Sequence, residues 1–386
     1  MLRNCLIENQ FNMINKNINN ESTNKKKLTI NMTWRMLVKR FFFLFLPLVL
    51  IILVGVNYFV DAENLYYQQY ERIMARYVVK GNNITNISKY DDRMYQKYAI
   101  AEMRECPDII VVGSTRTMMI NKYYFGNYTF FNNSMNGTTI EDIITLIMLY
   151  DKKNCLPENI IIGIDPWLLN KNNYQERWKS LSFEFNDALE RLGIESVEIE
   201  KKYIHQRPNK LFSLHYFFDS IHKTAKQAKK PLITKRNFNQ ATTKLEDGSI
   251  IYSKSFRERS LEEINQNVVI TLKKRSAYGF EGNGNFNEKN QMAFETLINY
   301  LINNGINVIF YFSPYHPMAY KTFSGNPKYK NFINSEIYFK NLAKENRIQC
   351  IGSFNPYKLG MDESYFLDYQ NSNYKCVNEL VAKIEF

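Results

Sequence analysis

The pattern of apolar and polar positions divides the chain into four parts. Residues 1–40 are polar, with many Asn and Lys among the first 33, and predict a disordered cytoplasmic tail. Residues 41–60 form one apolar stretch, and residues 61–106 predict a helical stalk that leads into a domain. Residues 107–386 alternate short apolar runs with amphipathic segments. This alternation predicts an α/β domain that follows a single apolar helix.

The stretch 41–60, FFFLFLPLVLIILVGVNYFV, has no charged residue and is long enough to span a bilayer. It is too long and too far from the start for a signal-peptide core, and no small-residue cleavage site follows it cleanly. A buried core helix is the alternative. Basic residues precede the stretch and acidic ones, Asp61 and Glu63, follow it. The positive-inside rule therefore predicts a single-pass anchor in the cell membrane, with the N-terminus cytoplasmic and the main domain extracytoplasmic.

Short apolar runs in the domain have the length and composition of strands buried on both faces. We expect strands at 107–113, 158–167, 306–314 and 348–354, and helices at 141–153, 288–304, 334–346 and 373–384. Strands that alternate with helices predict a parallel sheet with helices on both faces. The segment at about 168–265 breaks this rhythm. It is charged, aromatic and mostly helical in appearance, and we interpret it as an insertion over one edge of the sheet.

Composition and cysteine content narrow the possible functions only slightly. The net charge is +12, but the positive residues are scattered and no nucleic-acid motif accompanies them, so we expect no nucleic-acid partner. Cys106 and Cys155 each precede a predicted strand, so a disulfide between them is geometrically possible. Cys350 and Cys376 complete a set of four exported cysteines, which allows three full pairings. No cysteine or histidine spacing suggests a metal, and we expect no cofactor.

The segment IIVVGSTRTMMI, residues 109–120, places Ser114 after a buried strand and before residues that look helical. A helix N-terminus offers unpaired N–H groups and the positive end of the helix dipole, which favour negative charge beside a hydroxyl. Serine is also a preferred helix cap. Ser114 is therefore either a nucleophile or only a structural cap.

Three further loops are expected near Ser114, because ligands bind at the carboxyl ends of the strands in such sheets. They contain Gly137 in NNSMNGTTIED, Asp165 in IGIDPW and Asp368 in MDESYFLDYQNSN. The four loops in this order resemble the SGNH/GDSL hydrolase superfamily. More narrowly, they are similar to its membrane-anchored branch, which includes the D-alanyl transfer protein of teichoic acid systems and alginate O-acetylation proteins. The resemblance covers roughly residues 60–386 and implies a flavodoxin-like domain outside the membrane.

The resemblance also implies roles for individual residues. Ser114 would be the nucleophile, and the N–H groups of Ser114 and Gly137 would line an oxyanion hole. Asp165 stands where many of these proteins have an oxyanion-hole Asn. A carboxylate there would repel an oxyanion unless it were protonated or turned away. Arg116 would bind a carboxylate or support the loop, with a surface salt bridge as the alternative.

The chain departs from the family at the C-terminal motif. The family uses Asp-x-x-His, in which the histidine takes the proton of the serine and the aspartate orients it. Here the match is Asp368-Tyr369-Gln370-Asn371, so an amide without useful basicity replaces the base. We therefore assign Asn371 to oxyanion or substrate binding. His316, in FYFSPYHPMAY, follows the third predicted strand and is the candidate replacement base, with substrate binding as its other role.

Three functional hypotheses remain. The first is an O-acyltransferase or esterase that modifies a surface glycan or acylated polymer through Ser114, with a membrane-bound O-acyltransferase as candidate partner. The second is a catalytically degenerate SGNH-like protein that binds glycan or a partner. The third is an unrelated anchored α/β protein. Aromatic residues of the insertion can stack on sugars, although core packing is their commoner role; examples are Tyr203, Tyr216, Phe217 and Phe218.

Overall fold

The chain forms two compact units in this computed structural model. The first, which we call the anchor unit, comprises Met1–Ala62 and His205–Ala228, and the second, the α/β unit, comprises Glu63–Ile204 and Lys229–Phe386. The structure describes residues 33–60, 69–87, 90–197, 211–225, 232–235, 240–274 and 286–386, together with 23, 25 and 281. Most of the predicted tail 1–40, Tyr203 and the first residues of the stalk thus lie outside the described residues.

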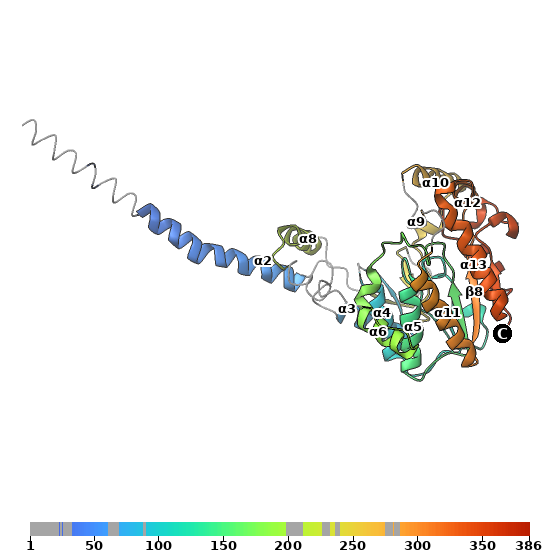
Figure 1. Ribbon diagram of the computed structural model, residues 1–386. Coiled ribbons are helices and arrows are strands. Elements are labelled where there is room, and N and C mark those ends of the chain that lie inside the picture. Colours follow the sequence, from blue (N-terminus) through green and yellow to red (C-terminus); the bar gives the residue numbers. More distant parts are fainter. Residues whose placement is uncertain are drawn as a thin grey trace, which may run out of the picture. The chain divides into compact units, whose positions relative to one another are not determined.

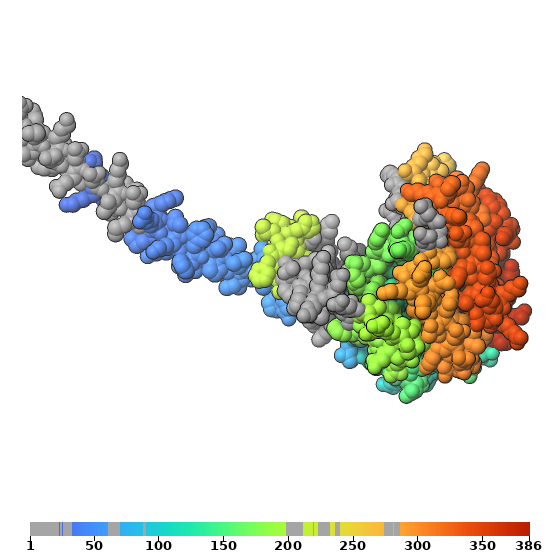
Figure 2. Space-filling model, viewed as in Figure 1, coloured from blue at the N-terminus to red at the C-terminus, as the bar shows by residue number. Residues whose placement is uncertain are grey.

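The anchor unit contains one helix that runs from Thr33 to Val60, 28 residues, and ends in α2 (Leu46–Val60) after a π-helical turn, η1 (Phe41–Phe45). Among the described residues it is the one helix long and apolar enough to cross a membrane. Only 11% of its most apolar part is buried, which disfavours the alternative of a buried core helix. A shorter helix, α8 (Leu214–Ala225), packs against α2 (Figures 1 and 2).

A parallel sheet organises the α/β unit. Its five strands, within the described residues, are β2 (Ile109–Val112), β3 (Phe130–Asn132), β4 (Asn159–Gly163), β8 (Asn307–Phe312) and β9 (Gln349–Gly352). They are ordered β3-β2-β4-β8-β9, which is 2-1-3-4-5 when these strands are numbered along the chain. The predicted parallel sheet is confirmed, and β3 is a strand that the sequence pattern did not predict.

Alternation along each strand builds two hydrophobic cores, because successive side chains point to opposite faces of a sheet. Ile110, Ile160 and Phe310 face the larger core, whereas Ile109 and Ile161 face the smaller one. Helices α5 (Ile140–Lys152) and α11 (Glu288–Asn303) lie side by side over the larger core (Figure 1). Helix α14 (Tyr374–Val381) covers the opposite face. The prediction of helices on both faces is confirmed.

The remaining helices complete these layers and the insertion. They are α3 (Gln69–Val79), α4 (Asp92–Glu102), α6 (Ser182–Arg191), α9 (Lys254–Arg257), α10 (Leu261–Lys274), α12 (Pro317–Ser324) and α13 (Lys330–Asn346). The start of α5 shows how local sequence sets an end. The Thr139 hydroxyl accepts from the Asp142 N–H, and the Asp142 carboxylate accepts from the Thr139 N–H, which forms a capping box.

The insertion contains strands as well as helices. A small antiparallel sheet joins β1 (Asn83–Thr85) with β5 (Leu232–Thr234), β6 (Thr243–Lys244) and β7 (Ile250–Ile251), in the order β5-β1-β6-β7. Gly248, with φ of +79°, allows the tight turn between β6 and β7. The Asn132 N–H of β3 donates to the Asp247 carbonyl oxygen at 2.8 Å. This hairpin therefore covers the exposed edge of the parallel sheet at β3.

Candidate functional site

The segment after β2 is a series of turns and not the helix that the sequence predicts. Residues 115–119 form turns, held by N–H groups of Thr117 and Ile120 that each donate to the carbonyl oxygen three residues earlier. The Ser114 hydroxyl accepts from the Arg116 N–H at 3.2 Å. Ser114 thus caps a turn, its side chain is buried (1% exposed), and the expected support from a helix N-terminus is absent at this position.

Arg116 is buried and connects the serine turn to the neighbouring loops. Its Nη1 donates to Asp165 Oδ1 at 2.8 Å, in an ion pair whose two side chains are 1% and 3% exposed. Its other nitrogens donate to the carbonyl oxygens of Ser313, Pro314 and Gln370. The surface salt bridge considered for Arg116 is therefore wrong, and its role is to support the loops. A guanidinium with these partners has little capacity left for a substrate.

Asp165 follows β4 at the carboxyl edge of the sheet, next to Ser114. Burial raises the pKa of its carboxyl group, whereas the charge of Arg116 and hydrogen bonds from Ser114 and Arg116 lower it. The ion pair directs this carboxylate toward Arg116 and Ser114. Asp165 is therefore placed to contact the serine hydroxyl and to neutralise the arginine.

The loop that contains Gly137 is tied to the serine turn by short contacts. Thr138 Oγ1 donates to the Gly113 carbonyl oxygen at 2.5 Å, and the Met135 N–H donates to the same oxygen at 2.8 Å. Gly137 has φ of +59°, a conformation that favours glycine. A Cβ at this position would collide with the guanidinium of Arg177. The loop before α5 is thereby fixed to Gly113, the residue before Ser114.

A second buried arginine, Arg93 of α4, forms hydrogen bonds with the loop that contains Gly137 and with the start of α5. Both Asp142 carboxylate oxygens accept from it, at 3.1 and 2.7 Å, and the carbonyl oxygens of Asn136 and Gly137 accept at 2.9 and 3.1 Å. Sequence reasoning missed Arg93, because nothing in the stalk pattern marks a buried cation. Apart from the neighbouring Asp92, the partners of its guanidinium group lie more than forty residues away along the chain.

The Asp368–Asn371 motif keeps the geometry of an aspartate that orients its third neighbour. Asp368 Oδ1 accepts from the backbone N–H groups of Gln370 and Asn371 at 2.8 and 2.7 Å, and Asp368 Oδ2 accepts from Asn371 Nδ2 at 2.8 Å. Asn371 Oδ1 is buried and has no hydrogen-bond partner among the described residues. An oriented side chain thus has an unpaired acceptor at the position that the resemblance assigns to the base.

Both ring nitrogens of His316 contact residues other than Ser114. Its Nδ1 accepts from the Met318 N–H at 3.3 Å and caps α12, and its Nε2 contacts Asn265 Oδ1 of α10 at 3.1 Å. The ring is fully buried, and burial lowers the pKa of His316 to about 4. This geometry gives His316 a capping function and offers no support for its role as replacement base.

A cavity of about 500 Å³ opens beside the serine turn, at the carboxyl ends of the strands. Side chains with amide, hydroxyl and aromatic groups dominate its lining, which comprises Thr115, Asn136, Gly137, Trp167, Asn172, Asn173, Tyr174, Gln175, Arg177 and Gln370. We call it the serine-side cavity. The Tyr174 ring is 84% exposed, and the Arg177 guanidinium forms no ion pair with a described residue. Sequence reasoning missed both residues, because they lie at the start of the insertion.

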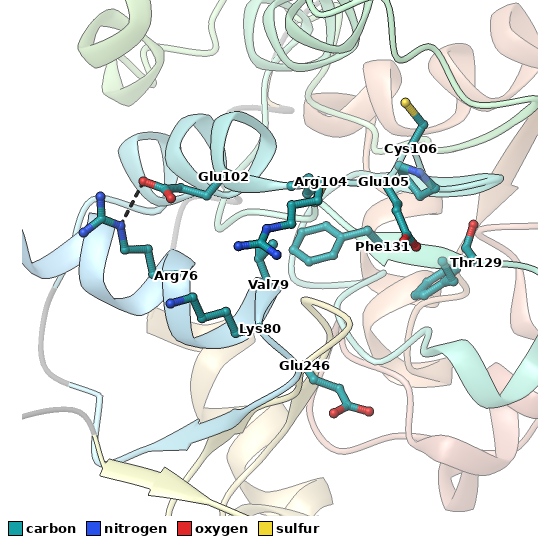
Figure 3. A pocket seen from close by; sticks show the side chains of 13 residues that line it. Arg76, Val79, Lys80, Glu102, Arg104, Glu105, Cys106, Thr129, Phe131 and Glu246 are labelled. Carbon is teal, nitrogen blue, oxygen red and sulfur yellow. Dashed lines mark hydrogen bonds and ion pairs between the residues drawn. The ribbon is translucent and has the colours of Figure 1, made fainter.

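A larger cavity of about 650 Å³ lies at the opposite, amino-terminal edge of the sheet (Figure 3). Three basic and three acidic side chains line it, and Arg76 pairs with Glu102 at 3.0 Å. It contains none of the predicted site residues. The disulfide between Cys106 and Cys155 lies at this edge, whereas Cys350 and Cys376 are free thiols.

Comparisons with known proteins add no relative. No protein-family model matches the chain, and no curated protein matches it in sequence. Among the described residues, no group of three or more His, Cys, Asp or Glu side chains is arranged to hold a metal ion. The candidate site is therefore defined by its own geometry: a buried serine, an Asp–Arg pair, an oriented amide and a polar cavity beside them.

Proposed function

We propose that this protein is a membrane-anchored, extracytoplasmic SGNH-like protein that takes part in cell-envelope polysaccharide modification by binding a glycan in the serine-side cavity. Strand order 2-1-3-4-5 is that of flavodoxin-like sheets, which supports the family resemblance. The convergence of the four loops around Ser114 and Arg116 supports it further. It also makes an unrelated protein the weakest of the three hypotheses.

Two features support an extracytoplasmic location. The helix that ends at Val60 is preceded by basic residues, which favours a cytoplasmic N-terminus. The disulfide between Cys106 and Cys155 belongs to an oxidising compartment, because reducing systems of the cytosol keep most thiols free. The α/β unit is then on the outer side of the membrane, where envelope glycans are found.

The lining of the serine-side cavity supports a glycan as ligand. Amide and hydroxyl groups match the donors and acceptors of sugar hydroxyls. The exposed ring of Tyr174 offers an apolar face for a sugar ring, and Arg177 supplies a donor for a carbonyl or acidic group of the polymer.

Asn371 is the observation that makes binding the better conclusion than covalent chemistry. An amide cannot take the proton of Ser114, and loss of the histidine of a serine triad costs about 10⁶-fold in kcat in the subtilisin example. The unpaired Oδ1 of Asn371 is buried and Asn371 does not line the serine-side cavity, so we assign the glycan contacts to the residues of the cavity lining. Ser114 itself is 1% exposed, which limits attack on a bulky ester.

O-acyl transfer or deacylation through Ser114 is the second candidate, favoured by the contact between Ser114 and Asp165. Burial raises the pKa of that carboxyl group, so Asp165 is the described side chain best placed to accept a serine proton. Its ion pair with Arg116 opposes this role. In this case a membrane-bound O-acyltransferase would be the partner that supplies acyl groups.

A fluorophosphonate probe separates the two candidates. For a binding protein we expect no labelling of the full chain in detergent, with Ser114→Ala as the control. Labelling that Ser114→Ala abolishes would establish the second candidate. Asn371→His is a complementary test of the same site, because a new esterase activity in this variant would mean that the parent chain lacks only the base.

Glycan binding is tested directly with envelope polysaccharide fragments. We expect Tyr174→Ala to weaken binding about three- to tenfold, since a stacking contact is worth roughly 0.5–1.5 kcal/mol. Tyr123→Ala is the matched control, because Tyr123 is also exposed (68%) but lies away from the cavity lining. Equal affinities of Tyr174→Ala and the parent chain would contradict the proposed site.

A further inference from the structure

A segment of the insertion returns to the anchor helix and packs against its end. Asn57 of α2 donates from Nδ2 to the carbonyl oxygens of Leu211 and Ser213, at 2.7 and 3.1 Å. These residues directly precede α8 and are 154 and 156 positions further along the chain. A side-chain amide on an apolar helix is costly unless it is hydrogen-bonded. Asn57 therefore marks a built contact between α2 and α8.

Helix α8 has one buried face and one exposed apolar face. Tyr216 and Ser220 are buried (3% and 0% exposed), and they identify the face toward α2. Leu214, Phe218 and Ile221 are 62%, 58% and 43% exposed. At 100° per residue, Phe218 and Ile221 lie within about 40° of Leu214, on the side away from Tyr216. A stripe of large apolar side chains thus faces outward.

Polar side chains of α8 occupy a separate edge. His215 and His222 are exposed and lie about 80–100° from Leu214 around the helix axis. The helix therefore has a face packed on α2, an unpacked apolar face and a polar edge. This division is typical of helices that lie in a membrane interface, with one face among acyl chains and another toward water.

The unpacked apolar face continues into the surface of α2. Phe212, 63% exposed, and α2 side chains such as Ile51, Val54 and Tyr58 line an apolar groove of about 440 Å³. The exposed surface of α2 is suited to acyl chains, and Phe212, two residues before α8 begins, extends this apolar surface toward α8. Large contiguous apolar patches mark contacts with a membrane or a partner. Because this apolar surface adjoins α2, which is expected to span the bilayer, we favour the membrane over a protein partner.

We propose that α8 is a second membrane contact of this protein: it lies in the lipid interface beside the end of α2, with Leu214, Phe218 and Ile221 among the acyl chains. The inference requires that α2 spans the bilayer and is independent of the chemistry at Ser114. Its consequence is that the insertion fixes the chain to the membrane at two points, and not through a single flexible helix.

Tryptophan quenching by brominated lipid tests this contact in the full chain. Trp34 is first replaced by Phe, and Trp is then introduced as Phe218→Trp on the apolar stripe, His222→Trp on the polar edge or Leu50→Trp in α2. Each variant is reconstituted into phosphatidylcholine–phosphatidylglycerol vesicles without bromine, with acyl chains brominated near the headgroup, which test positions 214, 218 and 222, or with acyl chains brominated near the terminal methyl group, which test position 50 at the middle of the span. Native Trp167 and Trp178 contribute the same background to all variants.

We expect the tryptophan at position 218 to lose about two- to threefold more of its emission than the one at position 222, and Leu50→Trp to be quenched as well. Leu214→Trp, on the same stripe, should repeat the result. Quenching at position 218 no stronger than at position 222, with Leu50→Trp quenched, would overturn the inference, and weak quenching at both positions would favour a protein partner for the stripe. Absence of quenching in Leu50→Trp would overturn both the anchor and the inference, whereas glycan binding would be unaffected.

Discussion

The buried pair of Arg116 and Asp165 allows a quantitative test of how the candidate site is held together. We expect Arg116→Met to destabilise the α/β unit by about 3–5 kcal/mol, the usual cost of removing one member of a buried ion pair. The methionine fills most of the space but leaves the Asp165 carboxylate buried without its counter-charge. It also removes the donors of three backbone carbonyl groups.

The expected loss of stability in Arg116→Met follows from the contacts that Arg116 makes. Four hydrogen bonds from a charged donor are worth roughly 1.5–3 kcal/mol each, but they do not add, because one side chain makes them all. A loss of 3–5 kcal/mol corresponds to a decrease in Tm of roughly 6–15 °C for a unit of this size. Asp165→Asn should cost less, because the arginine keeps its carbonyl partners and an amide oxygen still accepts from Nη1.

The assay is thermal and urea unfolding of the full chain in detergent, followed by circular dichroism. Arg191→Met is the matched control: Arg191 pairs with Asp151 at 3.2 Å near the surface, and such a pair is worth about 0–1 kcal/mol. The double variant of Arg116→Met and Asp165→Asn should be about as stable as Arg116→Met alone. The reasoning is refuted if Arg116→Met falls within about 1 kcal/mol of the control, or if the two single effects add.

Two further predictions concern the loops around the site. Gly137 and Gly126 both have φ near +60°, so Gly137→Ala and Gly126→Ala should each lose about 1 kcal/mol of stability. Only Gly137→Ala should also weaken glycan binding, because its methyl group displaces the guanidinium of Arg177. Equal glycan affinities of the two variants would contradict this prediction. His316 is neutral when folded, since burial lowers its pKa from 6.5 to about 4, whereas the unfolded chain gains the proton. The free energy of unfolding should therefore fall by up to about 3 kcal/mol as pH decreases from about 6.5 toward 4. His316→Asn keeps a capping side chain and should reduce the change in Tm over this pH range. An unchanged dependence of Tm on pH in this variant would show that other groups cause the loss.

Local pattern was sufficient for the long elements. The apolar stretch 41–60 and the runs that became β2, β4, β8 and β9 were predictable, because a membrane helix or a strand buried on both faces needs a continuous run of apolar residues. The same pattern could not reveal β3 or the small antiparallel sheet. These strands are two or three residues long, and they exist because of partners far along the chain.

The site divides in the same way. The sequence alone determined that Ser114, Gly137, Asp165 and Asp368 lie in four separate segments between predicted elements, and that Asn371 stands three residues after Asp368, because residue identity and the order of segments along the chain follow directly from it. Only the tertiary structure decided that the residues after Ser114 form turns and not a helix. Arg116 is drawn into the interior by Asp165, 49 positions away, and by carbonyl groups about 200–250 positions away. Helix propensity is a local preference of well under 1 kcal/mol per residue, and a buried charge that finds distant partners outweighs it.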